Sequence, residues 1–407
     1  MIRLADEDNQ WAENVYNEVL QRDRVLRGEI QQSEPFNFML DEVRTWNAGG
    51  TVMQYPFGYI VTFPSRRHIF RGEHRRYPHT ESSLSRKTRG MQPIDREIMH
   101  VVSNMRVSQF KKLIWNINVV PYWEAKLSEV NYKALAQHYG LDTFLLDLTN
   151  DFRTALFFAT CKFENGQWQP LTQADIDRSD DTKIGVIYHT PDWTIDFMQP
   201  RSKLRWFMYH QADRRNKPYV IDSGGLDGFA FQIGLQPLHR CHTQSGYIYP
   251  MKTVQPLDEN PQFERIEFPQ SAAFSREVFE MMHEGRDIYP EEGITKGLDI
   301  VDEIKNGLTF SEDDLRQAYE LDECNRELFP LQSDLKTALE KTDLFERPIE
   351  FKAGEIDYHF TESQLDCINK NYDDKDLLEP VCGMMHQKPD AKEYRDNRCR
   401  EIFGELI

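Results

Sequence analysis

Residues 131–163, NYKALAQHYGLDTFLLDLTNDFRTALFFATCKF, constrain the fold more than any other stretch of the chain. Their apolar side chains first recur at helical spacing until Gly140 ends the pattern, and residues 143–149 then have the apolar character of a buried strand. Asn150 and Asp151 are good N-cap residues, and the apolar positions after them return to one helical face. The stretch therefore predicts a helix, a tight glycine turn, a buried strand and a second helix that form one core unit.

Asp147 is the informative residue of this unit, because it places a carboxylate between Leu146 and Leu148 inside the predicted strand. An unpaired buried charge is costly, so we expect this carboxylate to have partners or to lie near the strand end. One interpretation is structural: Asp147 accepts hydrogen bonds from loop amides or an arginine and holds the fold. The other interpretation places Asp147 in the wall of a ligand cleft.

Length and composition indicate a folded protein of two or three domains. The chain has 407 residues, of which 39% are hydrophobic and 12% aromatic, and it can therefore bury a sizeable core. The first ten residues, MIRLADEDNQ, lack the apolar core of a signal peptide, and no run of 18 or more apolar residues occurs. We therefore expect a cytoplasmic protein without a membrane partner.

Cysteine and histidine usage gives little sign of a metal site. The six cysteines are scattered, without a CxxC pair or a zinc-like spacing, and are expected to be reduced and mostly buried. His239 and His242 are three residues apart but lack a carboxylate ligand pattern. The sequence therefore predicts no bound metal.

The negative charge of the chain is confined to its last third. Residues 251–407 carry 19 Lys and Arg against 38 Asp and Glu, a balance of −19, so the first 250 residues carry +1 of the total of −18. This shift, near residues 250–261, is the best candidate for a domain boundary. We predict a helical segment over 1–50, a domain over 51–255 and an acidic, mostly helical domain over 256–407.

Basic residues gather in two places in the first part of the chain. Residues 65–89 carry eight Lys or Arg against only two Glu, and a second basic cluster covers 201–217. In the first cluster, Arg71 is predicted at the end of a strand, beside Gly72, which lets the chain turn and lets a ligand approach the backbone. A guanidinium fork suits phosphate or carboxylate. The alternative is that the basic run is a solvated charged loop.

The remaining elements follow from periodicity and from turn residues. A polar surface loop is expected between Cys161 and Lys183. Strands are expected in the ranges 51–63, which holds two strands with a turn at Pro56 and Gly58, 183–188, 228–234 and 241–251. Helices are expected in the ranges 7–31, 38–46, 91–127, 274–283, 300–304, 311–324, 335–344, 364–372 and 391–406.

Three motifs in this order resemble the FRG domain family, which is named for a Phe-Arg-Gly motif. They are the segments Phe70-Arg71-Gly72-Glu73, ALAQHYGLDTFLLDLT with the following ALFFA, and HRCHTQSGYIYP, and the resemblance covers about residues 55–255. The chain departs from the family pattern at three places. It has Phe144 where an arginine is usual, Leu148 where a tryptophan is usual, and the sequence Thr243-Gln244-Ser245-Gly246 where the family commonly has QQG.

The resemblance implies an α+β fold with a split antiparallel or mixed sheet and helical insertions, similar to the ADP-ribosyltransferase architecture. In that architecture a basic residue on the first strand helps to hold NAD, and a glutamate on the third strand assists the reaction. The resemblance then gives four candidate catalytic residues, Arg71, Glu73, Asp147 and Gln244. It also gives the candidate cofactor-binding residues Arg71, Gly72, Tyr139, Thr149, Gly246 and Tyr247.

Three functions are open at this point. The first is an NAD-dependent, ADP-ribosyltransferase-like enzyme that modifies a protein or nucleic acid, as a toxin or phage-defence component. Because a glutamine supplies neither a negative charge nor a general base, Asp147 or Glu73 would have to replace the missing glutamate. The second is a nucleotide-binding or nucleic-acid-binding module without chemistry. The third is a scaffold, whose acidic C-terminal third binds a partner protein or covers the basic face in cis.

Overall fold

The computed structural model describes eleven ranges of the chain: 2–3, 51–55, 58–62, 68–126, 130–164, 166–191, 230–233, 236–244, 246–320, 324–354 and 356–372. The helices expected within 7–31, 38–46 and 391–406 and the basic cluster at 201–217 lie outside these ranges. Among the described residues, no helix is both long enough and apolar enough to cross a membrane.

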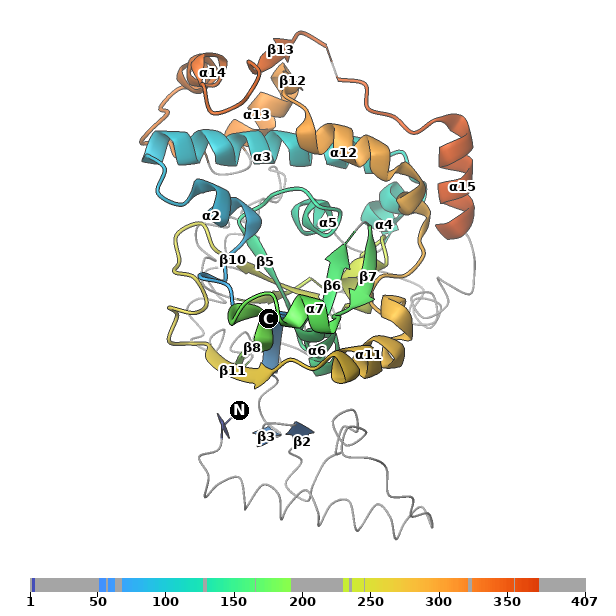
Figure 1. The fold of residues 1–407 in the computed structure, drawn as a ribbon. Coiled ribbons are helices and arrows are strands. Elements are labelled where there is room, and N and C mark those ends of the chain that lie inside the picture. Colours follow the sequence, from blue (N-terminus) through green and yellow to red (C-terminus); the bar gives the residue numbers. More distant parts are fainter. Residues whose placement is uncertain are drawn as a thin grey trace, which may run out of the picture.

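A six-stranded sheet lies at the centre of the fold, and all of its strand pairs are antiparallel (Figure 1). Its strands, in order across the sheet, are β11 (Glu264–Pro269), β8 (Ile184–Pro191), β4 (His68–Glu73), β5 (Leu145–Thr149), β10 (Gly246–Pro250) and β9 (Phe231–Gln232). The expectation of an α+β protein with an antiparallel sheet is confirmed.

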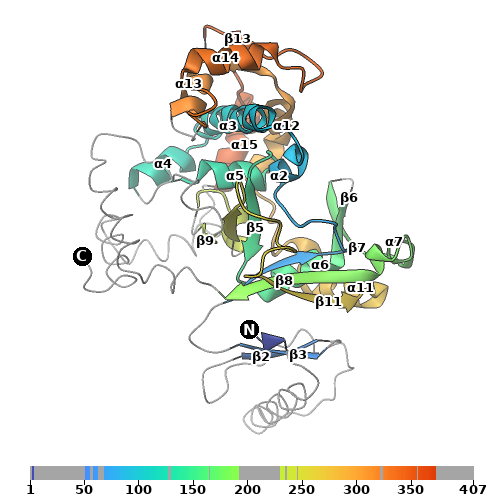
Figure 2. The same ribbon diagram turned by 90° about the vertical axis from the view of Figure 1, so that its left-hand side faces the viewer.

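The sheet has a weak seam between β4 and β5. A single registered pair, Phe70 with Thr149, joins these strands, whereas β4 pairs with β8 over six residues and β5 pairs with β10 over five. The direction of β5 differs steeply from that of β8 and β11 (Figure 2). The sheet therefore consists of two halves, β11-β8-β4 and β5-β10-β9, that meet at one point.

The core unit predicted from residues 131–163 is present. Asn131 caps α5 (Tyr132–His138) by accepting a hydrogen bond from the Ala134 amide at 3.0 Å, and Gly140 follows the helix with a φ of +94°. After β5, the Asp151 carboxylate caps α6 (Phe152–Thr160). It accepts hydrogen bonds from the backbone amides of Arg153 and Thr154 at 3.1 and 3.2 Å. Local capping and turn chemistry therefore determine this unit.

Gly72 does not turn the chain, and that prediction is wrong. Strand β4 continues through Gly72 to Glu73, and Gly72 pairs with Ile187 of β8. A Cβ atom at this position would lie 1.7 Å from the carbonyl oxygen of Ala155 in α6. The glycine is required because helix α6 packs directly against the strand backbone.

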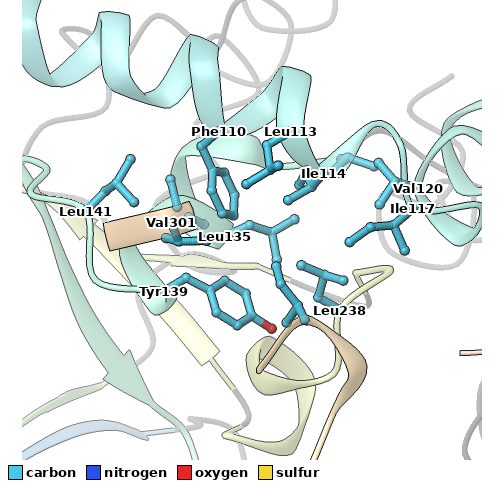
Figure 3. Close-up of a cluster of buried hydrophobic side chains, with 14 of the residues drawn as sticks. Phe110, Leu113, Ile114, Ile117, Val120, Leu135, Tyr139, Leu141, Leu238 and Val301 are labelled. Atoms are coloured by element: carbon cyan, nitrogen blue, oxygen red, sulfur yellow. The ribbon is translucent and has the colours of Figure 1, made fainter. Parts of the chain in front are cut away.

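The described residues form four hydrophobic clusters, of which three include strands of the central sheet and one lies among α3 and elements of the C-terminal third. In one of them, α6 and α11 (Ala272–Met281) cover the half-sheet that contains β4, β8 and β11. The largest cluster joins α5 to α3 (Pro93–Ile114), to α12 (Leu298–Asn306) and to α15 (Glu362–Tyr372). Figure 3 shows this cluster, with Phe110 and Leu113 of α3 above Leu135 and Tyr139 of α5.

The C-terminal third shares these cores. Helices α13 (Glu312–Glu320) and α14 (Gln332–Lys341) pack against α3, beside the parallel pair β12 (Thr309–Ser311) and β13 (Glu350–Lys352) (Figure 1). Strand β11, which follows the predicted boundary at residue 255, is an edge strand of the central sheet. Residues on both sides of that boundary therefore contribute to the same cores, and the boundary itself stays a prediction.

Two other predictions differ from the structure. The polar stretch after Cys161 is an ordered hairpin, β6 (Cys161–Glu164) and β7 (Gln167–Pro170), followed by α7 (Gln173–Ile176), rather than a loop. The first part of the strand expected over 241–251 is instead a short helix, α10 (Arg240–Thr243).

The remaining elements are short. The strands expected within 51–63 are present as β2 (Thr51–Tyr55) and β3 (Gly58–Thr62), which form a small sheet with β1 (Ile2–Arg3). The further helices are α2 (Ser83–Thr88), α4 (Val119–Lys126), η2 (Asp181–Lys183), η4 (His283–Gly285) and η5 (Gly293–Gly297). The four described cysteines are unpaired, and all except Cys367 are buried, as expected.

His100 on α3 gives the fold a pH dependence. Its side chain is 2% exposed, its Nδ1 lies 3.3 Å from Oε1 of Glu97, and its Nε2 lies 3.1 Å from Nδ2 of Asn104. Burial lowers the pKa of His100 to about 4, although the hydrogen bond with Glu97 opposes the shift. The folded state therefore takes up this proton only well below the pH at which an unfolded histidine does.

We expect the free energy of unfolding to fall between pH 6.5 and pH 4, with His100 contributing about 1.4 kcal/mol per pH unit. The sign follows from the lowered pKa, because the unfolded state binds more protons in this window. Urea unfolding at several pH values should give a shallower slope for His100→Gln than for the parent chain. The matched control is His359→Gln, because His359 is 65% exposed, and its slope should equal that of the parent. Equal slopes for all three proteins would contradict the assignment.

Candidate functional site

The side chains of Arg71 and Asp147 lie on opposite faces of the central sheet. Arg71 pairs with Tyr188, which belongs to the same hydrophobic cluster as Leu148. Asp147 follows the opposite alternation and pairs with Ile248, which belongs to the cluster around α5. The two residues meet through the backbone, because Nη1 of Arg71 donates to the carbonyl oxygen of Asp147 at 2.9 Å. Arg71 therefore links the two halves of the sheet beside their only registered pair.

Glu73 lies on the same face as Arg71 and is engaged there. The Glu73 carboxylate accepts from Nε of Arg71 at 3.1 Å through Oε1 and from the Thr80 hydroxyl at 2.8 Å through Oε2. Its side chain is 6% exposed, whereas that of Arg71 is 23% exposed. Both carboxylate oxygens of Glu73 therefore have protein donors, and the arrangement suits an acid that holds Arg71.

The Asp147 carboxylate is the most accessible of the four predicted catalytic groups. Its side chain is 39% exposed, and Oδ1 accepts from Nε2 of Gln137 at 2.7 Å. Nε2 of His138 lies 3.8 Å from the same oxygen, too far for a hydrogen bond. The carboxylate is thus oriented by a neutral amide and remains open to solvent.

Gln244 is buried and holds two segments together. Its side chain donates through Nε2 to the carbonyl oxygen of Ile288 at 3.0 Å, and the residue is 6% exposed. Its backbone carbonyl accepts from the Thr149 hydroxyl at 2.7 Å, so Thr149 connects the end of β5 to the segment before β10. The amide is fixed by these contacts, and Thr149 is itself buried.

The remaining predicted cofactor-binding residues take part in packing. Tyr139 is 5% exposed and Tyr247 is 1% exposed, and they belong to different clusters on the two sides of the sheet. A Cβ atom on Gly246 would lie 2.9 Å from the carbonyl oxygen of Cys241, and the α6 backbone fills the space beside Gly72. The structure therefore does not bring Tyr139, Tyr247 and Arg71 together around one exposed surface.

A group of buried polar residues that the sequence did not single out surrounds Asp147. The Arg240 guanidinium lies over the rings of Tyr139 and Tyr289, at 4.7 and 4.3 Å from their centroids. Its Nη1 donates to the carbonyl oxygen of His138 at 2.5 Å. Gln137 and His138 belong to the AQHYG segment, and Arg240 lies in the HRCHTQSG segment, so the motifs carried a signal for these three residues.

Glu292 is the hub of this buried group, and no local signal marked it. It is 2% exposed, and its carboxylate accepts from the hydroxyls of Tyr139 and Tyr372 and from the backbone amide of His239, the last two at 2.9 Å. Because Tyr372 is the last residue of α15, Glu292 connects α15 to Tyr139, which follows α5, and to His239, which precedes α10. It lies in the acidic third, where an inward-facing glutamate cannot be told from its exposed neighbours by sequence.

Burial makes the imidazole beside Asp147 neutral. Desolvation lowers the pKa of His138, and the nearby negative charge of Asp147 only partly offsets this shift. Burial also raises the pKa of Tyr289, which therefore keeps its hydroxyl proton. The exposed charge at this place is the Asp147 carboxylate, which the neutral Gln137 amide orients, whereas the Arg240 guanidinium and the Glu292 carboxylate are buried. Such a site can stabilise a developing positive charge or accept a proton.

The described part of the basic run is largely paired with carboxylates. Arg76 makes a two-point contact with Glu267 of β11, at 3.0 and 2.5 Å. Lys87 pairs with Asp142 and Arg89 pairs with Glu81, each at 2.5 Å. Arg76 therefore forms an ion pair with an acid of the C-terminal third. Arg75 is exposed, and its guanidinium lies 4.6 Å from the centroid of the Tyr77 ring.

The two departures in the second motif are buried. Phe144, in the place of the usual arginine, is 4% exposed, and the guanidinium of Arg96 lies 5.3 Å from its ring centroid. Leu148, in the place of the usual tryptophan, packs in the cluster on the Arg71 face of the sheet. Neither position presents a side chain to solvent.

Comparison with known proteins gives one match. The family model of the FRG domain matches residues 66–167. This range contains β4, the helices α2 to α6 and β5, and it therefore includes Arg71, Glu73 and Asp147 but not Gln244. No curated protein and no solved structure matches the chain.

Proposed function

Because the chain contains an FRG domain over residues 66–167, we propose that it is an ADP-ribosyltransferase-like enzyme. In this proposal it binds NAD and modifies a macromolecule, as an effector of a toxin or phage-defence system. One observation carries the proposal: of the two carboxylates that could replace the missing glutamate, Asp147 and Glu73, only Asp147 has an accessible side chain. It is 39% exposed, against 6% for Glu73 and for Gln244.

The chemistry requires a negative charge close to the ribose. When the bond between ribose and nicotinamide breaks, nicotinamide leaves with the bonding electrons and positive charge develops on the sugar. A carboxylate stabilises that charge and can accept the proton that the acceptor nucleophile loses. Asp147 is suited to both tasks, because the Gln137 amide fixes its orientation without neutralising it. The lowered pKa of His138 favours a neutral imidazole beside this carboxylate.

Arg71 has a positioning role in this proposal. Its hydrogen bond to the Asp147 carbonyl oxygen fixes β5 at the residue that carries the reacting carboxylate. Glu73 and Thr80 hold the guanidinium in place from the other side. The seam between the half-sheets supports the analogy with a split-sheet architecture, which is an analogy of fold alone. Contact of Arg71 with the pyrophosphate of NAD remains a prediction from the resemblance.

Nicotinamide release from NAD tests the proposal. With candidate protein and nucleic-acid acceptors present, the parent chain should release nicotinamide, and Asp147→Asn should lower the rate about 100-fold or more at unchanged thermal stability. The matched control is Asp180→Asn, because Asp180 is 94% exposed and pairs with Lys183 on the surface. Its rate should equal that of the parent. Equal rates for the parent and for Asp147→Asn would contradict the assigned role.

The alternative is a module that binds nucleotide or nucleic acid without chemistry. The pair formed by the exposed Arg75 and the half-buried Tyr77 favours it, because a base can stack on such a pair. A parent chain that releases no nicotinamide but binds labelled RNA, with an affinity that falls steeply with salt, would support this alternative against the enzyme.

A further inference from the structure

Two loops beside the Arg71 face of the sheet bring a histidine and two carboxylates together. His79 lies in the loop after β4, and Asp258 and Glu259 lie in the loop after β10. Nδ1 of His79 is 3.5 Å from Oδ2 of Asp258 and 3.4 Å from Oε1 of Glu259. The three ligand atoms all lie within 4.8 Å of one another.

These separations suit a shared cation better than direct hydrogen bonds. Among the described residues, Nδ1 of His79 is a buried atom without a hydrogen-bond partner, although it faces two carboxylates. Ligands that surround an ion at about 2.1 Å in a tetrahedron are separated by about 3.4 Å, which is close to both measured distances. One imidazole with two carboxylates is a ligand set for a divalent transition metal, and the imidazole disfavours Mg²⁺ and Ca²⁺.

The backbone holds the two loops in this arrangement. The Thr80 amide donates to Oδ1 of Asp258 at 2.8 Å, and the Leu257 amide donates to the Thr80 carbonyl oxygen at 2.8 Å. Oδ1 of Asp258 is therefore occupied, and Oδ2 is the oxygen that faces His79. A ligand set that is already positioned by its own loops loses little entropy when a metal binds.

The surroundings of the cluster are rich in negative charge. Glu81 is two residues from His79 in sequence, is 6% exposed and pairs with Arg89 at 2.5 Å. Glu73 is connected to the same loop through the Thr80 hydroxyl. A divalent cation would reduce the repulsion among these carboxylates.

We propose that His79, Asp258 and Glu259 bind a divalent transition-metal ion such as Zn²⁺. Glu259 is 48% exposed, against 14% for Asp258, so water can complete the coordination on the solvent side. The metal joins the loop after β4 to the loop after β10. Through Thr80 and Glu73 it supports the orientation of Arg71. Metal binding at this site can be measured whether or not the chain has the proposed transferase activity.

Titration of the chelator-treated, full-length protein with Zn²⁺ tests the site. The affected variant is His79→Ala, and the matched control is His283→Ala, because His283 pairs with one carboxylate, Asp287, at 2.9 Å. The parent and His283→Ala should bind Zn²⁺ with equal affinity, and His79→Ala should bind at least about 10-fold more weakly. Zn²⁺ should also raise the melting temperature of the first two proteins by more than that of His79→Ala.

Cobalt supplies a readout that does not depend on stability. Co²⁺ in place of Zn²⁺ should give a visible absorption band in the parent that is lost in His79→Ala and in Asp258→Asn. If His79→Ala binds Zn²⁺ as tightly as the parent and keeps the Co²⁺ band, the metal lies elsewhere and the proposal is overturned. If the parent binds neither ion, His79 forms an ion pair with the carboxylates, and the proposal is likewise overturned.

Discussion

Replacing Gly72 with alanine should destabilise the protein by at least about 3 kcal/mol. The added Cβ would lie 1.7 Å from the Ala155 carbonyl oxygen, and 2.8 Å from the Ala159 amide nitrogen. Both atoms belong to the backbone of α6, so no side-chain rotation relieves the contact. The helix would have to move away from β4, which would open the cluster that contains Phe70 and Leu156. Urea unfolding monitored by circular dichroism measures the loss.

The matched control for this substitution is Gly354→Ala. A Cβ atom at Gly354 meets no heavy atom within 4 Å, so this variant should unfold close to the parent value. These two variants also distinguish a packing role of Gly72 from a role in the close approach of a cofactor. If Gly72 serves only the close approach of a cofactor, Gly72→Ala will retain the stability of the parent and lose ligand binding. A destabilised protein is expected instead.

Replacing Glu292 with alanine should destabilise the protein by about 3–5 kcal/mol. The substitution leaves the hydroxyls of Tyr139 and Tyr372 and the His239 amide without their acceptor in a site where Glu292 is 2% exposed. Each lost acceptor leaves a buried donor that water reaches poorly. Because Tyr372 lies at the end of α15, this helix should lose protection first in amide hydrogen exchange.

The neighbouring residue offers the control. Glu291 is exposed, and Glu291→Ala removes the same type of side chain one position away. Its unfolding free energy and its exchange pattern should match those of the parent. If both variants lose stability equally, the general charge of this segment matters and the hydrogen bonds of Glu292 do not.

The local elements of the core unit could be predicted because their signals lie within a few residues. Asn131 marks where α5 begins, Gly140 where it ends and Asp151 where α6 begins, and each acts on its own neighbours. The same is true of β2 and β3, which are close in sequence and pair antiparallel. In these places the sequence-based prediction agrees with the structure, because local signals determine the elements and tertiary contacts do not change them.

The placement of the candidate site residues depends on contacts between distant segments. Arg71 and Asp147 both lie on strands, as predicted, but the register between β4 and β5 decides which face each occupies. No local pattern gives that register. Gly72 looked like a turn residue because the α6 backbone that requires it is more than 80 residues away in sequence. The Gln137 amide that holds Asp147 and the Ile288 carbonyl oxygen that holds Gln244 likewise become visible only in three dimensions.

The charge of the last third was a poor guide to its packing. Net charge reports on the exposed side chains, whereas Ile266, Phe268 and Phe274 continue the cluster that contains Phe70. In α12 and α13, apolar positions at helical spacing face α3, and most of the acids are exposed. Asp314 of α13 is an exception, because it is buried and pairs with Lys112 of α3 at 2.9 Å. An abrupt change in charge can therefore coincide with an uninterrupted hydrophobic core.

The order of the strands affects how the protein forms during synthesis. Strand β5 ends at Thr149, but its long partner β10 begins at Gly246, and β11 is completed only at Pro269. When the FRG segment has been translated, β5 still lacks its partner β10 and the edge partner β11 is also missing. These strand edges stay unpaired while about 100 more residues are translated. Such edges invite pairing with other chains. We therefore expect chaperones to assist the folding of this chain in the cell.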